Sequence, residues 1–389
     1  MHIEFCSSES TSLGIEMELE LVDAGTRELR SGATEVLDAL GAGYEGGAHP
    51  KAKHELFEST IEIITGVCAT VPEARADLAG TLAELRTETD PRGIELLCSG
   101  THPFSRWENQ VVSPDPRYHN LIEEMQWMAS RLQIFGIHVH VGVRSAARAI
   151  AIANALASYI PHLLALSASS PYWQGKDTGL ASSRSKVFEG LPTAGLPYQL
   201  EDWSEFETFM STLISAKAIN SIRDVWWDIR PHPNFGTVEL RICDGLPSLR
   251  EVAAVAAVSH CLVEWMNGVY DRQGELPVHR NWVIRSNKWR AARHGVDAEI
   301  IVDDEGHLVP LRDAIDDLAT QLGPVAERLG CGPELEYART MAERPSYVRQ
   351  REVVAAGGSL EDVVDSLVGE LRTDEPWQPS SAATPRPAG

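Results

Sequence analysis

The most regular alternation of apolar and polar residues lies near the N-terminus, in the segment SLGIEMELELVD. Apolar residues alternate there with Glu16, Glu18 and Glu20, a period of two that predicts a β-strand with one buried face. Successive side chains of a strand point to opposite faces, so the three carboxylates share a face, with neighbours about 7 Å apart. Like charges on one face repel. The pattern is compatible with a solvated outer face or with a face that binds a cation.

Two later segments predict strands that also carry charged or imidazole groups on one face. In GIHVHVGV, His138 and His140 alternate with valines, and in TVELRIC, Glu239 and Arg241 alternate with aliphatic residues. A single histidine on a strand is usually structural, and Glu239 beside Arg241 could form a simple ion pair. Each strand alone therefore leaves the question open.

A further acidic segment, HELFESTIEIITGVC, gives two conflicting signals. Glu55, Glu58 and Glu62 are spaced three and four apart, which would place them on one face of a helix. The isoleucines from Ile61 onward indicate a strand instead. Both forms stay open from the sequence.

The remaining pattern predicts mostly helices. Residues 70–89 begin with a capping box, Thr70 to Glu73, and have proline in the first turn. Residues 94–98 are predicted as a strand, and residues 169–202, rich in Gly, Pro and Ser, as a long loop of the kind that usually carries function. Further helices are predicted at residues 33–40, 117–135, 146–166, 205–215, 246–269, 287–294, 311–329 and 360–371.

Composition indicates a globular protein with an acidic surface. The 389 residues are 43% hydrophobic and 23% charged, and 34 Lys and Arg against 56 Asp and Glu give a net charge of −22. Such a surface argues against nucleic acid or an anionic membrane as the main partner, since both prefer a basic surface. It does not exclude a small anionic substrate, because arginine and metal can invert the charge locally.

Targeting and cysteine patterns point to the cytoplasm. The N-terminus lacks the basic and apolar regions of a signal peptide, and the six cysteines contain no CxxC pair, so we expect reduced thiols. The most apolar run, residues 149–168, contains Asn154, Pro161 and His162, which suits a buried helix better than a membrane span.

Two nucleotide-binding motifs are excluded. Gly41, Gly43 and Gly46 fit GxGxxG, but a dinucleotide site requires the motif to follow a strand and open a helix, and here a predicted helix precedes it. The GxxxxGK[ST] sequence of a P-loop is absent from the chain.

Together, the four polar segments predict one shared cavity. Each lies beside an apolar run that fixes the opposite face in a core. Carboxylates with a single histidine suit a hard cation, Mg²⁺ or Mn²⁺, and Mg²⁺ commonly bridges nucleotide phosphates. An arginine on the same face suits a phosphoryl group in transfer, where catalysis is mostly positioning and charge neutralisation.

At these segments the chain resembles the type 2 glutamate–cysteine ligases, or carboxylate–amine ligases, of the glutamine synthetase-like superfamily. The resemblance rests on the segments above together with GTHPF, SSPYWQGKDT, ASSR, WDIRPHPNFGTVELRICD, RHGV and GGSL, in family order. It implies an α+β fold in which a curved, mainly antiparallel sheet is flanked by helices and carries the active site on its concave face. It also implies one ligase domain over residues 1–372, while the Pro- and Ser-rich residues 373–389 are predicted to be a disordered tail.

The resemblance further implies ATP and Mg²⁺ or Mn²⁺ as cofactors and a small amino acid or amine as substrate. ATP would phosphorylate a carboxylate, typically the γ-carboxylate of glutamate, and an amine such as cysteine would attack the acyl phosphate. Relatives are generally homo-oligomers, so a homodimer is expected. Carried over residue by residue, the implied roles are one metal group of Glu16, Glu55 and Glu62, a second of Glu18, His138 and Glu239, and phosphate stabilisation by Arg241. Arg184, Arg230 and Asn234 are further candidates, either for contacts to a carboxylate or phosphate or for ordinary surface roles.

Two other kinds of function remain as alternatives. A zinc hydrolase could use the pair His138 and His140, since HxH at a strand end is a zinc-type arrangement, but this leaves the glutamates of the first strand unexplained. A relative that has lost catalysis could bind a small molecule only, although every candidate metal position holds a plausible ligand.

Overall fold

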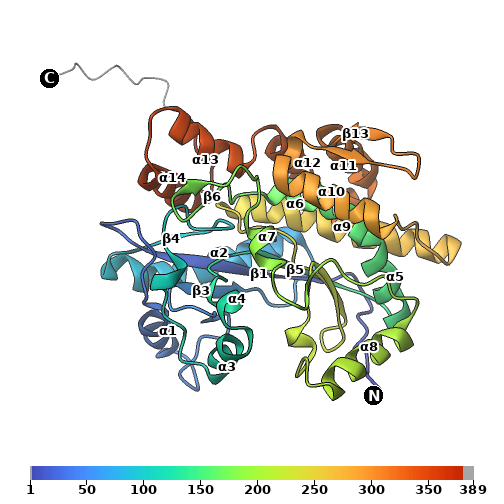
Figure 1. Cartoon of the computed structure of the whole chain (residues 1–389), viewed down its shortest axis with the longest axis horizontal. Coiled ribbons are helices and arrows are strands. Elements are labelled where there is room, and N and C mark those ends of the chain that lie inside the picture. The colour runs from blue at the N-terminus through green and yellow to red at the C-terminus, as the bar shows by residue number, and fades with distance from the viewer. Residues whose placement is uncertain (1, 380–389) are drawn as a thin grey trace.

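One antiparallel sheet organises the computed structural model, which describes residues 2–379. Its strand order is β10-β11-β5-β1-β3-β2, and β4 pairs with the second half of β1. Figure 1 shows β1 crossing the middle of the molecule, with α1 and α3 at lower left, α8 at lower right, and α9 to α13 above. The strands are β1 Leu13–Asp23, β2 Ala52–His54, β3 Thr60–Ile64, β4 Ile94–Leu97, β5 Ile137–Gly142, β10 Ile229–His232 and β11 Thr237–Leu240.

Helices cover one face of this sheet. The alternating apolar residues of β1 are buried in the main core, where α2 packs on β1, α9 on β5, and α5 on β10 and β11. The predicted period of two is therefore confirmed, and the intervening glutamates point to the other face. The helices are α1 Ala33–Gly41, α2 Val71–Thr89, α3 Pro116–Met125, α4 Trp127–Ser130, α5 Ala146–Leu156, α6 Ile160–Ser167, α7 Arg184–Phe188, α8 Trp203–Ser215, α9 Leu249–Gln273, α10 Asn281–His294, α11 Leu311–Leu329, α12 Gly332–Glu343, α13 Ser346–Ala355 and α14 Leu360–Thr373.

The single helix predicted at residues 117–135 is wrong. Helix α3 ends at Met125, and Gln126 takes a φ of 50°, which lies outside the helical region. Only the short α4 follows, and residues 131–136 form an irregular connection to β5. The break turns this segment back toward the sheet, where Leu132 and Ile134 line the cavity described below.

The ambiguous acidic segment is a strand from Thr60 onward, and the helical alternative is wrong. The residues before Thr60 form a turn that separates the three glutamates. The Glu58 carboxylate accepts hydrogen bonds from the Thr34 hydroxyl (2.6 Å) and the Thr34 amide (3.1 Å), so it caps the start of α1. Glu58 therefore leaves the polar group that the sequence suggested.

The predicted loop at residues 169–202 contains short regular pieces. They are α7 and the two-residue strands β6 Tyr172–Trp173, β7 Lys176–Asp177 and β8 Ala194–Gly195, the last of which pairs in parallel with β9 Trp226–Trp227. Beyond the sheet, β12 Glu299–Ile301 and β13 Leu308–Pro310 form a small hairpin. The loop as a whole lies against β9 and α10 and brings Arg184, Phe188 and Leu191 to the cavity.

Two helical stretches, Ala146–Ser167 and Leu249–Gln273, are long and apolar enough to span a membrane. In their most apolar windows, 78% and 83% of the residues are buried inside the protein. The first is also interrupted by a 3-10 turn, Ala157–Tyr159, directly before the proline of α6. Both stretches are therefore mostly buried in the core, which agrees with the prediction of a buried helix for the run at 149–168.

The prediction of a disordered tail from residue 373 onward is wrong for the first residues of that segment. Asp374 accepts hydrogen bonds from the Arg75 guanidinium and from the Arg250 amide (2.8 Å). Trp377 packs against the core cluster formed by α14 and β4, and the Arg344 guanidinium lies 5.5 Å from its ring centroid. Packing therefore continues beyond α14, and residues 380–389 lie outside the described residues.

Candidate active site

A cavity of about 580 Å³ lies on the sheet face opposite the covering helices. Its walls come from the central strands, from the loop around α7 and from the segment that leads into β9. Every residue to which the sequence analysis gave a metal, phosphate or substrate role lines it: Glu16, Glu18, Glu55, Glu62, His138, Arg184, Arg230, Asn234, Glu239 and Arg241. The prediction that separate strands contribute to one polar cavity is therefore confirmed in its placement.

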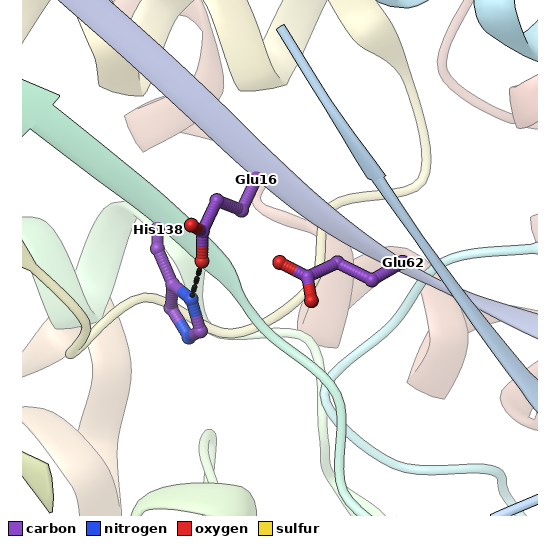
Figure 2. Close-up of side chains that lie close together, drawn as sticks. All are labelled: Glu16, Glu62 and His138. Atoms are coloured by element: carbon purple, nitrogen blue, oxygen red, sulfur yellow. Dashed lines mark hydrogen bonds and ion pairs between the residues drawn. The ribbon is translucent and has the colours of Figure 1, made fainter. Parts of the chain in front are cut away.

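Glu16 and His138 face each other across neighbouring strands (Figure 2). The Nδ1 atom of His138 lies 2.8 Å from Oε2 of Glu16, and Figure 2 shows the Glu62 carboxylate pointing toward the same pair from β3. These three residues offer ligand atoms within 4.8 Å of one another. The Nε2 atom of His138 is turned the other way, 3.9 Å from Oε1 of Glu18.

His140 forms a second group with Glu16 and Glu239. Its Nε2 atom lies 3.4 Å from Oε1 of Glu16 and 3.7 Å from Oε1 of Glu239, while Nδ1 is 3.0 Å from the Thr237 hydroxyl. The two histidines thus fall in different clusters of ligand atoms, which disfavours the zinc centre built on both of them. The sequence analysis placed His140 on the polar strand face but gave it a role only in that alternative, and it missed the position of His140 between two carboxylates.

Two carboxylates of this cavity, Glu18 on β1 and Glu62 on β3, resist ionisation, mainly because they are buried. Burial and the Glu55 charge raise the pKa of Glu18 to about 7. Burial and the charges of Glu16 and Glu55 raise the pKa of Glu62 well above its usual value. Glu16 differs, because its hydrogen bonds and charge interactions with His138 and His140 outweigh burial and hold its pKa well below the usual value.

The donor set of this cavity fits a divalent cation. Carboxylate oxygens are the ligands that Mg²⁺ and Mn²⁺ prefer, and one imidazole nitrogen among them does not exclude either ion. Oε1 of Glu62 and Nε2 of His140 are buried and have no hydrogen-bond partner among residues 2–379. A positive ion between these groups would give the two atoms a partner. Its charge would also offset the repulsion between the carboxylates and so lower their pKa values. On its other side, Glu62 already meets one cation, since its Oε2 lies 3.2 Å from Nζ of Lys53.

Glu239 is held between two arginines. Its Oε2 accepts a hydrogen bond from Nε of Arg230 at 2.8 Å and forms an ion pair with Nη2 of the same guanidinium at 2.7 Å, and its Oε1 accepts a hydrogen bond from Nη1 of Arg241 at 2.5 Å. Burial alone would raise the pKa of Glu239, but the two guanidinium groups hold it well below the usual value. Glu239 therefore stays ionised without a metal.

The two arginines differ in how many of their N–H donors are already bonded to protein groups. Arg230 also donates through Nη1 to the carbonyl oxygens of Ile222 (2.9 Å) and Val225 (2.8 Å). Its donors are therefore committed to protein groups, which favours a positioning role over the direct substrate contact expected from the sequence. Arg241 contacts Glu239 and His138 through Nη1 alone, and its buried Nε has no partner in the described part of the chain.

Arg184 reaches the cavity because residue 136 has no side chain. A Cβ at Gly136 would lie 2.2 Å from Nη2 of Arg184, so the guanidinium occupies the space that any other residue would fill. Arg184 is 3% exposed, lies 4.0 Å from Oδ1 of Asp244, and approaches the backbone carbonyls of Arg241 and Ile242 at 3.4 Å. Its Nε is buried without a partner among the described residues.

Two residues fall outside or at the margin of the predicted group. Glu20 shares its strand face with Glu16 but does not line the cavity, because its Oε1 accepts hydrogen bonds from the hydroxyl (2.8 Å) and amide of Ser99. Burial raises the pKa of Glu20 well above its usual value. Asn234 lines the cavity from the exposed turn between β10 and β11.

The sequence analysis missed a pair of aromatic rings beside Asn234. The rings of His232 and Phe235 stack with centroids 4.1 Å apart and an 8° angle between their planes, and both line the cavity. Burial lowers the pKa of His232 to about 4, so its imidazole is neutral near pH 7. The RPHPNFG segment contains both residues, but only the turn geometry stacks them.

Solved structures of ligases share this fold. A glutamate–cysteine ligase from Francisella tularensis, solved in complex with AMP, aligns with a TM-score of 0.70 at 13% identity over 96% of this chain and 90% of that one. A bifunctional glutathione synthetase from Pasteurella multocida aligns with a TM-score of 0.69 at 15% identity, over 94% of this chain and 52% of that longer chain. At such identities the likeness concerns the fold.

This chain shares the fold of these ligases and carries an acidic cavity on one face of its sheet. The model of glutamate–cysteine ligase family 2 matches residues 12–366, so the chain belongs to this family and is an ATP-dependent ligase that forms carbon–nitrogen bonds. A Frankia casuarinae protein provisionally named glutamate–cysteine ligase 2-1 is 60% identical over 378 residues, 97% of this chain and 99% of that protein. A Thermobifida fusca protein provisionally named glutamate–cysteine ligase 2 is 51% identical over 382 residues, 98% of this chain and 96% of that protein.

Proposed function

We propose that this ligase activates a carboxylate, the γ-carboxylate of glutamate, as an acyl phosphate and joins it to the amine of cysteine or of another small amino compound. The observation that carries the proposal is the cavity itself, which places ionisable carboxylates opposite an arginine whose fork is partly free. Family membership supplies the ATP-dependent ligase class, and the acyl phosphate and the substrates are the part we propose.

In the proposed first step, an oxygen of the substrate carboxylate attacks the γ-phosphorus of ATP, and the bond from that phosphorus to the bridging oxygen breaks to release ADP. The charge on the transferring group develops beside Arg241, whose Nη1 is held by Glu239. Because Arg230 fixes Glu239 in turn, the guanidinium of Arg241 is oriented before the substrate arrives. Preorganised donors of this kind lower the barrier without reorganising during the reaction.

In the proposed second step, the amine attacks the acyl carbon, the carbon–oxygen bond to phosphate breaks, and the nitrogen loses a proton. The products are an amide and inorganic phosphate. Arg184 and Asn234 are the proposed contacts to carboxylate or phosphate oxygens, Arg184 from the α7 side and Asn234 from the β10–β11 turn.

The proposed cation sites are one group of Glu16, Glu55 and Glu62 and another of Glu18, His138 and Glu239. Mg²⁺ or Mn²⁺ bound there would neutralise phosphate charge during transfer. Without an ion, Oε2 of Glu16 orients His138 through Nδ1, which leaves Nε2 facing Glu18. A carboxylate on the far ring nitrogen commonly fixes the orientation of a histidine ligand in this way.

Hydroxylamine trapping tests the acyl phosphate directly. The purified enzyme with ATP, Mg²⁺, glutamate and hydroxylamine is expected to form γ-glutamyl hydroxamate together with an equal amount of ADP. Replacing glutamate by other carboxylates, and hydroxylamine by a panel of amines that includes cysteine, identifies both substrates. ADP release that needs no carboxylate, or an amide formed without ADP, contradicts the proposal. We further propose that the protein is cytoplasmic and forms a homodimer, and sedimentation of the purified protein tests the homodimer.

A further inference from the structure

A second cavity, of about 560 Å³, lies outside the catalytic cavity and has no part in the proposed reaction. It is bounded by α7, α8, α10 and the short parallel pair β8 and β9. We propose that this cavity binds a small organic anion that carries a planar aromatic group.

Four aromatic side chains, Tyr198, Phe209, Trp227 and Trp289, line the second cavity. Phe209 and Trp227 lie with ring centroids 4.9 Å apart, and Tyr198 meets Trp227 edge to face at 5.7 Å. Trp289 lines the same cavity from α10 and is 49% exposed, although large aromatic side chains are usually covered. Flat apolar walls with an open side suit a planar ring, which gains from burial and from stacking.

Basic groups converge on the same cavity in a protein of net charge −22. Lys186 and Lys288 both pair with Glu189, and Lys288, which is 1% exposed, also pairs with Asp228 at 2.6 Å. Arg285 lines the cavity and has no ion-pair partner among residues 2–379. Three cations against two carboxylates leave a net positive charge, and an anionic group on the ligand would match it.

The two cavities share a wall in which consecutive residues line opposite cavities. Trp226 lines the catalytic cavity and Trp227 the second cavity, and Phe188 and Glu189 divide in the same way. The aromatic walls and cations described above therefore serve only the second cavity. The two cavities are connected through Asp228, which follows Trp227 and whose backbone carbonyl accepts a hydrogen bond from the amide of Arg241.

The test uses 2-naphthoate as the anionic aromatic probe and 2-naphthamide as its uncharged counterpart, each titrated into the full-length protein by calorimetry. We expect 2-naphthoate to bind about tenfold or more tightly than 2-naphthamide, because only the anion makes a charge-assisted contact. Arg285→Gln and Trp289→Ala should each weaken 2-naphthoate by about tenfold. Both residues are exposed, so the variants should fold.

Two control variants distinguish the second cavity from other places. Trp282→Ala removes an exposed tryptophan from the same helix that does not line the cavity, and Glu62→Gln changes the catalytic cavity, so neither should weaken the probe. Loss of binding in Glu62→Gln with full binding in Arg285→Gln would place the probe in the catalytic cavity and overturn the proposal. Equal affinity for both probes, equal loss in Trp282→Ala and Trp289→Ala, or the absence of measurable binding would overturn it as well. None of these readouts depends on ligase turnover.

Discussion

Arg241, directly after β11, donates a hydrogen bond of 2.5 Å from Nη1 to Oε1 of Glu239 within that strand. This hydrogen bond fixes the guanidinium through Nη1 only. The Nε atom is buried and has no hydrogen-bond partner in the described part of the chain. A buried, charged donor without a hydrogen-bond partner lowers the stability of the folded protein, unless a bound ligand accepts its hydrogen bond. This geometry makes Arg241 the first residue to test.

We expect Arg241→Ala to lower turnover by about 10²-fold or more, because it removes charge stabilisation made mainly in the transition state. Arg241→Lys should recover little of it, since an ammonium lacks the planar fork that grips two phosphate oxygens. Steady-state ADP release and the melting temperature should be measured on the same samples. If Arg241 only secures Glu239 in the sheet, turnover and melting temperature will fall together. Normal turnover in the variant would refute a catalytic role.

The second prediction concerns Glu62 and the metal requirement. Glu62→Gln keeps the size of the side chain but removes a charge that the cation should need, so the Mg²⁺ concentration for half-maximal turnover should rise by about tenfold or more. A direct readout is calorimetric titration of Mn²⁺ into the wild type and the variant without nucleotide. Glu58→Gln, outside the cavity, provides a control for losing one carboxylate. Full turnover of the wild type in EDTA, or stimulation by Zn²⁺ alone, contradicts the proposed cation sites.

Much of the site could be predicted because strand periodicity assigns each side chain to a face. Once Glu16, His138 and Glu239 are placed on strands with buried opposite faces, a sheet that pairs those strands brings the three together. The register that sets Glu16 against His138 is a property of the folded sheet and has no local signal.

What the sequence could not show depends on contacts between distant segments. The commitment of Arg230 to the carbonyl groups of Ile222 and Val225, and the break at Gln126, both follow from tertiary packing. The loop at residues 169–202 contains too few periodic residues to reveal α7 or the second cavity. The periodicity of the sequence predicts which face of a strand a residue occupies. It does not predict which residue from another segment that side chain contacts.

Gly136 gives a third prediction. In Gly136→Ala the new Cβ would lie 2.2 Å from Nη2 of Arg184, so the buried guanidinium must move. We expect the free energy of unfolding to fall by about 1–3 kcal/mol, the usual cost of overpacking, and turnover to fall because Arg184 leaves the cavity wall. Urea unfolding and ADP release measure the two effects. Gly369→Ala in α14 is the matched control, since a Cβ there has no neighbour within 4 Å. This substitution should lower neither the free energy of unfolding nor the turnover.

The fourth prediction separates the two parts of the C-terminal segment. Removing residues 374–389 deletes the Asp374 contacts with Arg75 and Arg250 and the packing of Trp377, so the free energy of unfolding should fall by about 1–3 kcal/mol. Removing residues 380–389 alone should change neither stability nor turnover, because their composition offers little apolar surface to bury. Thermal unfolding of both truncations beside the full chain decides this. Equal melting temperatures for all three would show that the Asp374 and Trp377 contacts contribute nothing measurable.

The last prediction uses His102, which lies in the GTHPF segment but does not line the catalytic cavity. Its Nε2 donates to the carbonyl of Arg27 at 2.9 Å, and its Nδ1 accepts from the amide of Ser105 at 3.0 Å, so the folded protein requires the neutral ring. Burial lowers its pKa to about 3 from an ordinary value of 6.5. The unfolded chain therefore binds one more proton between these two values, and stability should be lost as the pH falls below 6.5.

The size of this effect can be measured by difference. Between pH 7.5 and 5.5 the buried ring should contribute about 1.4 kcal/mol to the fall in the free energy of unfolding. Urea unfolding of wild type and His102→Gln at both pH values isolates it, because other titrating groups contribute equally to the two proteins. The loss on acidification should be smaller in His102→Gln by that amount, and the same substitution at the exposed His119 should leave the loss as in the wild type. An identical loss in wild type and His102→Gln would mean that residue 102 can be protonated without unfolding, which the two hydrogen bonds of its ring do not permit.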